Sequence, residues 1–287
     1  MSRRFRLLCL SGLMALLSAL LVPSLAGAGL PKSSNVPGGI VRVPLAPWSE
    51  SAPPPQAWLD EQRVLVMAEG GQWVALVGLS LDRQPGTYHL RIEGAPEKRQ
   101  ASFVIHAKHY PAQHITLQDS GKVDLSDADL ARVEGEMAKI QRLKRHWRES
   151  EFTDTQFALP AEGKLSGRFG LRRYFNGQAR APHAGFDIAV PRGSAVRANA
   201  SGVVLDVGEY FFNGKTVFVD HGNGLLSMYC HLDRIDVSVG QTVDKRQVLG
   251  LSGMTGRATG PHLHWSVILN GAMVDPELFV VRPASKR

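Results

Sequence analysis

Short runs of apolar or alternating residues, each ended by glycine or proline, follow one another along almost the whole chain after residue 36. In the first half, turn signals such as Pro37-Gly38-Gly39 and Pro85-Gly86 separate the runs. This length and spacing is typical of a small antiparallel β-sandwich. We therefore expect an N-terminal β-sandwich domain over residues 29–117. Its predicted strands are Ile40 to Val43, Val64 to Met67, Trp73 to Leu79, Tyr88 to Ile92 and Ala101 to Ile105.

The same strand pattern returns after Phe152, with dense glycine turns between the runs. No amphipathic helix of convincing length follows before the C-terminus. We expect an all-β C-terminal domain over residues 153–287, with functional side chains on its loops. The predicted fold class is therefore mostly β. The runs are Val203 to Val207, Thr216 to Asp220, Leu226 to His231, Val248 to Leu251 and His262 to Leu269.

One helix is predicted between the two β-rich regions, within a helical connector over residues 118–152. Ser126 and Asp129 have the spacing of a capping box at its start. Apolar residues then recur at steps of three or four, which predicts one buried stripe. The stripe consists of Leu130, Val133, Met137, Ile140, Leu143 and Trp147.

Residues 1–28 have the pattern of a cleavable export signal. Arg3, Arg4 and Arg6 precede an apolar run from Leu7 to about Leu21, and the small residues Ala26-Gly27-Ala28 follow. The run is shorter than the roughly 20 residues of a membrane-spanning helix, so we expect no stable transmembrane anchor after cleavage. The mature chain would then act in the periplasm or be secreted.

Charge and cysteine content bear on partners and on covalent cross-links. The formal charge of +7 includes the three arginines of the signal, which leaves +4 for the mature chain. No stripe of basic residues with interleaved aromatics accompanies this excess, so we expect no nucleic-acid partner. This excess of positive charge suits an anionic polymer such as peptidoglycan.

Since Cys9 lies in the signal, Cys230 is the one cysteine of the mature chain. This excludes an internal disulfide and predicts a buried thiol.

The segment 182–190 places His183 and Asp187 four positions apart. Gly185 and the apolar residues after Asp187 favour an extended strand, in which positions i and i+4 share a face. Both side chains would then point at one ion. Alone, this pair is weak evidence, because ordinary hydrogen bonding explains most such pairs.

Two histidines share one predicted strand near the C-terminus. Alternation along residues 260–267 places His262 and His264 on one face and Leu263 and Trp265 on the other. Zinc accepts imidazole and carboxylate ligands, and a catalytic site keeps three protein ligands and an open position for water. The His-Asp pair and one of these two histidines would complete such a set, and spacing does not decide which one.

A third histidine, His231, ends the run that begins at Leu226. Hydrolysis of an amide needs a polarised carbonyl, an activated water and a proton donor for the leaving nitrogen. A zinc ion with two unligated histidines supplies all three. The sequence therefore predicts a hydrolytic zinc site.

The C-terminal domain resembles the lysostaphin/LytM-type zinc endopeptidases, which cut peptidoglycan cross-bridges. The likeness extends over about residues 159–280. A single H-x-H motif would be weak support, whereas an ordered set of motifs in one domain is specific. The set is Gly167-Arg168-Phe169-Gly170, the His183/Asp187 pair, Asp220-His221-Gly222-Asn223-Gly224, Tyr229 with His231, and Gly253 through His264.

The resemblance implies a Zn2+ cofactor and a division of roles among the histidines. In that family the second histidine of H-x-H binds zinc, so the implied ligands are His183, Asp187 and His264. His231 and His262 would then take the catalytic positions, and the resemblance does not divide the roles between them.

Two positions depart from the family pattern. Arg246 stands where relatives commonly have a turn glycine, and Ser266 stands where many carry an acidic residue after H-x-H. Neither is an implied ligand. They bear on substrate preference and on the groups that support the ligands.

The implied function is a zinc-dependent endopeptidase that hydrolyses peptide cross-links of peptidoglycan, D-alanyl to diaminopimelate cross-links if the host is Gram-negative. One alternative is an inactive LytM-type module that binds and activates cell-wall amidases, and another is a zinc protease acting on protein substrates. All five implied residues are present, which favours the enzyme over the inactive module. They are His183, Asp187, His231, His262 and His264.

The N-terminal domain resembles the β-domain that precedes the peptidase in Gram-negative relatives, and we expect it to orient or partly cover the site. The sequence identifies no protein regulator.

Overall fold

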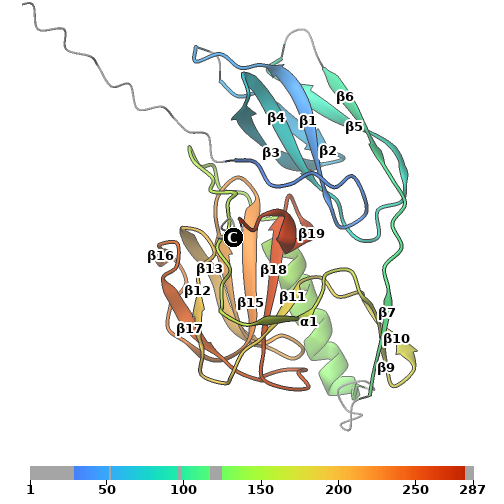
Figure 1. The fold of residues 1–287 in the computed structure, drawn as a ribbon, viewed down its shortest axis with the longest axis vertical. Helices are drawn as coiled ribbons and strands as arrows, with labels where there is room; N and C mark the ends of the chain where they lie inside the picture. The colour runs from blue at the N-terminus through green and yellow to red at the C-terminus, as the bar shows by residue number, and fades with distance from the viewer. Residues whose placement is uncertain (1–28, 52, 96–98, 117–124, 282–287) are drawn as a thin grey trace, which may run out of the picture.

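The computed structural model describes residues 29–51, 53–95, 99–116 and 125–281, so the predicted export signal lies outside the described residues. The predicted mostly-β fold is confirmed, and α1 (Asp127–Lys144) is the one α-helix in the described part of the chain. Figure 1 shows the N-terminal strands at the top and the C-terminal strands with α1 below them. Among the described residues, no helix has the length and apolar character of a membrane span.

The N-terminal region is one antiparallel sheet in the order β1-β4-β3-β2-β5-β6. The sheet folds over so that β1 also approaches β6, and it encloses an apolar core that includes Val77, Leu90 and Ile105. The five predicted runs correspond to β1, β3, β4, β5 and β6, whereas β2 escapes prediction because four residues carry little pattern. The strands are β1 (Ile40–Pro47), β2 (Gln56–Leu59), β3 (Gln62–Glu69), β4 (Gln72–Gly78), β5 (Gly86–Glu93) and β6 (Gln100–Ile105).

The C-terminal region is built on a ten-stranded sheet with the main order β16-β13-β14-β15-β18-β11-β8. The predicted runs correspond to β13, β14, β15, β17 and β18. A short 3-10 helix, Pro276–Leu278, follows the last strand. The strands are β8 (Lys164–Gly167), β11 (Phe186–Ala189), β12 (Ala195–Arg197), β13 (Gly202–Tyr210), β14 (Gly214–Asp220), β15 (Leu225–Ile235), β16 (Thr242–Val243), β17 (Val248–Ser252), β18 (Leu263–Leu269) and β19 (Ala272–Val274).

The two regions pack against each other at the C-terminal end of β18. Ile40 and Leu76 of the N-terminal sheet share one buried cluster with Trp265 and Leu269. At Gly78 a Cβ atom would lie only 2.5 Å from the carbonyl oxygen of Leu269, so the two backbones approach as closely as they can. The contact at Leu269 lies at the opposite end of β18 from His264.

A small three-stranded sheet joins the two regions at the side of the molecule (Figure 1). β7 (Ala112–Ile115) follows the last strand of the N-terminal sheet and pairs in parallel with β9 (Arg172–Phe175). β10 (Gln178–Ala179) completes this sheet as a hairpin with β9. The chain that leaves the N-terminal sheet therefore holds a hairpin of the C-terminal region.

Helix α1 begins where the sequence predicts. Ser126 is its N-cap, and the Ser126 hydroxyl accepts a hydrogen bond from the backbone N–H of Asp129 at 3.2 Å. The helix ends at Lys144, and the next residues turn back toward β14, where the Arg148 guanidinium pairs with the buried Asp220 carboxylate at 2.5 Å. The ends of the helix are thus fixed by its cap and by this ion pair.

The predicted apolar stripe of α1 is only partly buried, which corrects the expectation. Ile140 and Leu143 pack against the sheet, and Val133 is buried. Leu130 and Met137, in contrast, are 46% and 55% exposed. The two exposed side chains line an open groove that runs along the helix.

Candidate metal centre

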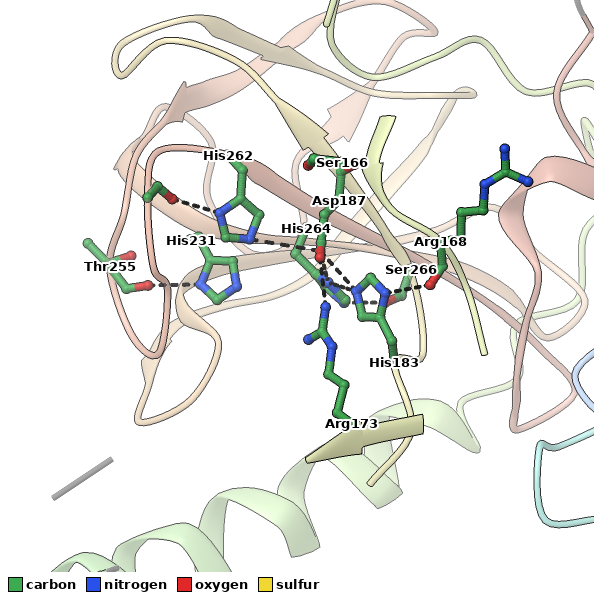
Figure 2. A network of polar contacts seen from close by, with 11 residues as sticks. Ser166, Arg168, Arg173, His183, Asp187, His231, Thr255, His262, His264 and Ser266 are labelled. Atoms are coloured by element: carbon green, nitrogen blue, oxygen red, sulfur yellow. Dashed lines mark hydrogen bonds and ion pairs between the residues drawn. The ribbon is translucent and has the colours of Figure 1, made fainter. Parts of the chain in front are cut away.

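The centre is built on the pairing of β11 with β18, in which Asp187 lies directly opposite His264. Neighbouring residues along these strands, such as Ile188 and Trp265, point into the core. Alternation therefore turns Asp187 and His264 to the other face of the sheet. There, Nδ1 of His264 lies 2.8 Å from Oδ1 of Asp187 (Figure 2).

His183 reaches the same point from a loop, so the prediction that His183 and Asp187 share a strand face is wrong. β11 begins only at Phe186, and the chain bends at Gly185. The backbone N–H of His183 donates to the carbonyl of Leu171 at 2.9 Å, which fixes the loop. As a result, Nε2 of His183 lies 2.9 Å from Oδ1 of Asp187.

Gly185 leaves the space that this loop needs. A Cβ atom there would lie 2.7 Å from Nε2 of His264 and 2.6 Å from Oγ of Ser266. Contacts that short do not occur for real Cβ atoms, so any other residue would displace the His264 ring. Position 185 therefore requires glycine, because the His264 and Ser266 side chains lie too close for a Cβ atom.

Three donor atoms converge, namely Nε2 of His183, Oδ1 of Asp187 and Nδ1 of His264. The two histidine nitrogens lie 3.0 Å apart, and each lies within 2.9 Å of the carboxylate oxygen. A tetrahedral zinc site with bonds of 2.0–2.1 Å separates neighbouring donors by about 3.3 Å. The set can therefore hold a metal ion after a small outward adjustment.

Outer hydrogen bonds fix the orientation of the two rings. Nδ1 of His183 lies 2.8 Å from the carbonyl of Arg168, which can only accept a hydrogen bond, so Nδ1 carries the proton and Nε2 of the neutral ring offers a lone pair. Nε2 of His264 lies 2.9 Å from Oγ of Ser266. Partners of this kind are characteristic of metal-binding histidines.

The protonation states also suit a cation. Burial raises the pKa of Asp187, but hydrogen bonds and charge from His183 and His264 outweigh burial and hold the pKa well below its usual range. Burial, together with His183 and Arg173, lowers the pKa of His264 to about 4 in spite of the Asp187 carboxylate. At neutral pH the carboxylate is ionised and the His264 ring is neutral, which are the forms that ligate a metal.

His231 and His262 lie beside this cluster with their ring centroids 4.7 Å apart (Figure 2). Nδ1 of His231 donates to the carbonyl of Thr255 at 2.8 Å, and Nδ1 of His262 donates to the carbonyl of Gly260 at 2.8 Å. In the neutral form of each ring, the lone pair therefore lies on Nε2. Nε2 of His262 lies 3.8 Å from Oδ1 of Asp187, so the structure brings all five predicted site residues together.

An unusual backbone angle turns His231 toward the site. Its φ is +62°, a conformation that side chains with a Cβ rarely adopt. The ladder between β15 and β18 ends one residue earlier, at Cys230 opposite His264. Cys230 is fully buried in an apolar cluster, as predicted, whereas the His231 ring reaches the site. Burial and the two neighbouring histidines lower the pKa of His231 to about 3.

The sequence does not indicate the role of Arg173, which binds the second carboxylate oxygen of Asp187. Nη2 of Arg173 donates to Oδ2 of Asp187 at 2.7 Å. Arg173 lies on β9, in the hairpin that β7 holds in place. No motif marks this arginine, because its position follows from pairing between distant segments.

A groove of about 910 Å³ opens beside the centre. Residues of α1 and of the segment 173–184 line it, together with His264 and Ser266. Five further histidines lie away from the metal centre. His221 is buried against Ser227, and the N-terminal region's His89, His106, His109 and His114 are exposed.

Two family descriptions match the chain. The description "Peptidase family M23" matches residues 181–276, and "Peptidase family M23 N-terminal domain" matches residues 33–108. A Pseudomonas aeruginosa protein crystallised as a candidate peptidase of family M23 is 40% identical, with a TM-score of 0.71. The match covers 86% of this chain and 95% of that one.

Curated relatives match over the C-terminal region. Peptidoglycan DD-endopeptidase ShyA of Vibrio cholerae is 39% identical over 121 residues, which is 42% of this chain and 28% of the relative. DD-carboxypeptidase/endopeptidase Mpg of Neisseria meningitidis is 38% identical over 113 residues, which is 39% of this chain and 26% of the relative. The chain thus matches little more than a quarter of the length of these relatives.

Proposed function

Since the chain belongs to peptidase family M23, we propose that it is a zinc-dependent endopeptidase that hydrolyses the peptide cross-links of bacterial peptidoglycan. The observation that carries the proposal is the convergence of three donor atoms next to two further histidines whose Nε2 atoms carry lone pairs. The names of the curated relatives favour a peptidoglycan substrate over a protein substrate.

His183, Asp187 and His264 would hold the zinc ion. The donor set of two imidazoles and one carboxylate fits zinc, and three protein ligands leave one position for substrate or water. When bound, zinc would polarise the scissile carbonyl and lower the pKa of a water molecule. The Arg168 carbonyl and the Ser266 hydroxyl would hold the two rings in their ligating orientations.

His231 and His262 would transfer protons at Nε2. Each ring is held by a hydrogen bond from Nδ1 to a backbone carbonyl, so Nε2 can accept a proton from the attacking water and later pass one to the leaving nitrogen. The lowered pKa of His231 keeps this ring neutral at neutral pH, as a base requires. A protonated ring beside the scissile bond would also stabilise the oxyanion of the tetrahedral intermediate.

We propose that the bond cut is a DD cross-link, in which a D-alanyl carbonyl is joined to the amino group of a second D-configured centre. The export signal predicted over residues 1–28 supports action in the periplasm or outside the cell. The modest positive charge of the mature chain is compatible with an anionic polymer as substrate.

The test is to incubate the purified, zinc-loaded protein with intact sacculi and to identify the released fragments by mass spectrometry. We expect cross-linked peptides to disappear and their monomers to accumulate. No cleavage by a zinc-loaded protein would overturn the enzymatic function, and so would equal cleavage by the His264→Ala variant.

A further inference from the structure

The two oxygen atoms of the Asp187 carboxylate have different neighbours. Oδ1 lies 2.9 Å from Nε2 of His183 and 2.8 Å from Nδ1 of His264, at the point where the three donor atoms converge. Oδ2, in contrast, accepts a hydrogen bond from Nη2 of Arg173 at 2.7 Å. Figure 2 shows the Arg173 side chain reaching from its strand to the carboxylate. One oxygen thus faces the histidines, and the other is engaged by the guanidinium group.

The backbone of β8 borders the same carboxylate. Gly167 lies opposite Asp187 in the pairing of β8 with β11. A Cβ atom at position 167 would lie 2.8 Å from Cγ of Asp187 and closer still to Oδ2, so the glycine leaves the space that this oxygen occupies. The side chains of Arg173 and Asp187 are only 20% and 13% exposed. A rotation of the carboxylate would therefore break a largely buried, charge-assisted hydrogen bond.

Arg173 is held in place by β7, the strand that follows the N-terminal sheet. Gln113 of β7 lies opposite Arg173 of β9. Beside this pair, the rings of His114 and Tyr174 stack with their centroids 4.7 Å apart and their planes inclined by 12°. Both strands lie between the residues that the two family descriptions match. The segment between the two matched regions thus delivers an arginine to the metal centre.

We propose that Arg173 is a positioning residue that holds Oδ2 of Asp187 away from the metal ion, so that Asp187 binds the ion through Oδ1 alone. β7 supports this task by holding β9 in place. The inference rests on the zinc site of the proposed function and adds to it a residue outside both family matches. Binding through one oxygen keeps a position of the ion open for water or substrate, whereas binding through both oxygens would fill it.

Two effects of Arg173 on a bound cation oppose each other. Its positive charge repels the ion, so removal of the charge alone would raise the affinity for zinc. Its hydrogen bond fixes the ligand, and removal of such an outer partner typically lowers metal affinity by roughly 10- to 100-fold. We expect the second effect to dominate, because the guanidinium contacts Oδ2 directly while the converging donors lie at Oδ1. The sign of the change therefore separates positioning from simple repulsion.

The first measurement is the zinc affinity of the full chain, by competition with a chromogenic chelator. Arg173→Met removes the donors and keeps the length of the side chain, so we expect roughly 10- to 100-fold weaker binding. Arg173→Lys keeps the charge but loses the planar fork, so its affinity should be intermediate. The matched control is Arg172→Met, because Arg172 is exposed and its Nε donates to the carbonyl of Tyr110 at 3.0 Å, away from Asp187. The control should bind zinc like the unmodified protein, and equal or higher affinity in Arg173→Met would overturn the proposal.

The second measurement replaces zinc with cobalt(II), whose visible absorption reports the number of ligand atoms. Four-coordinate cobalt(II) absorbs more strongly than cobalt(II) with five or six ligand atoms. We expect weaker bands per bound ion in Arg173→Met, in which both oxygens of Asp187 can reach the ion, than in Arg172→Met and the unmodified protein. A substitution that merely loosens the fold would lower the amount of bound cobalt and leave the absorption per ion unchanged. Identical spectra per bound ion would therefore overturn the proposed control of Asp187 by Arg173.

The contribution of β7 is tested by Gln113→Pro, which removes the backbone N–H opposite Arg173. We expect weaker zinc binding that approaches that of Arg173→Met, and no further loss when the two substitutions are combined. Gln113→Ala keeps the backbone N–H and is the matched control. His114→Ala, which removes the stack on Tyr174, is a milder second variant and should weaken zinc binding in the same direction. Circular dichroism and unfolding midpoints identify variants that lose their fold, and unchanged zinc affinity in both folded β7 variants would overturn the role of β7.

Metal binding is measured without turnover, so its outcome is independent of the digestion of sacculi. The expected order of affinities in a protein that cuts no sacculi would overturn the proposed function and leave the role of Arg173 intact. Equal affinities of Arg173→Met and the unmodified protein, in a protein that cuts sacculi, would overturn the role of Arg173 alone.

Discussion

Nδ1 of His264 lies 2.8 Å from Oδ1 of Asp187, across strands whose residues are 77 positions apart in the sequence. We expect His264→Ala to reduce bound zinc from about one ion per chain to almost none, because two remaining ligands cannot retain the ion against a chelator. Elemental analysis after dialysis measures the zinc content. The fold should persist, because the strand pairing on either side involves backbone groups.

His262→Ala is the matched comparison for that experiment. The His262 ring lies at the same site, but its Nε2 is 3.8 Å from Oδ1 of Asp187, outside the three converging donors. We expect this variant to keep its zinc and to lose turnover by roughly 100- to 10,000-fold, as for loss of a general acid or base. Loss of zinc from both variants alike would contradict the division of roles.

The positive φ of His231 allows the backbone and the side chain to be tested separately. A residue with a Cβ at φ +62° is disfavoured by roughly 1–2 kcal/mol, and glycine is not. His231→Ala and His231→Gly both remove the ring, so we expect both to lose turnover. The glycine variant should be more stable than the alanine variant by about 1 kcal/mol in urea unfolding. Equal stability would show that the strand does not impose this angle.

Ser266 is expected to tune the affinity for zinc. Its Oγ lies 2.9 Å from Nε2 of His264. We expect Ser266→Ala to weaken zinc binding by roughly 10-fold, because the ring loses its outer partner. Competition with a chromogenic chelator measures the affinity. Ser166→Ala is the control, since the Ser166 hydroxyl donates to the backbone carbonyl of Asp187, and an equal loss there would argue against a specific role for Ser266.

Much of the candidate site follows from local pattern. The period of two places Leu263 and Trp265 in the core and His262 and His264 on the other face, and both apolar residues are fully buried. The N-cap of α1 depends on neighbouring residues only, and the Ser126 hydroxyl accepts from the backbone N–H of Asp129 as the spacing predicts. Features fixed within four or five residues are therefore accessible from the sequence.

The remaining features depend on pairing between distant segments. His183 approaches Asp187 through a loop held by Leu171, and Arg173 is positioned by a strand that lies about 60 residues earlier. The positive φ of His231 arises where one strand leaves its neighbour. The exposed half of the α1 stripe is likewise set by what packs on the helix, which periodicity alone does not specify.

Burial of Cys230 predicts an unreactive thiol. Its side chain is fully buried, and burial raises its pKa from 9.0 to about 12. The change reduces the thiolate fraction roughly 1000-fold at mildly alkaline pH, and burial blocks access as well. We expect iodoacetamide to leave Cys230 unmodified in the folded protein and to modify it in denaturant, as measured by peptide mapping. Rapid labelling under native conditions would show that β15 opens readily.

His221 is expected to make stability depend on pH. Its Nδ1 donates to the carbonyl of Ser201 at 2.8 Å, and its Nε2 lies 2.8 Å from the Ser227 hydroxyl. Burial lowers the pKa of His221 below its ordinary value of 6.5 and outweighs the Ser201 carbonyl and the Asp220 carboxylate, which raise it. Below pH 6.5 the unfolded chain therefore binds a proton that the folded chain does not. The free energy of unfolding must fall as the pH drops through this range, and it is unaffected by this group above it.

His221→Gln removes the titrating group and keeps a polar side chain. The variant should be less stable than the unmodified protein near neutral pH, because the buried hydrogen bonds change. Below the ordinary histidine pKa, the difference should narrow by up to about 1.4 kcal/mol per pH unit, until the folded protein also becomes protonated. Urea unfolding of both zinc-free proteins between about pH 5 and 7.5 measures this difference, and removal of zinc keeps metal release out of the comparison. His231 and His264 titrate in both proteins, so their contributions cancel. Stability curves that stay parallel over the whole range would show that His221 is not held neutral in the folded state.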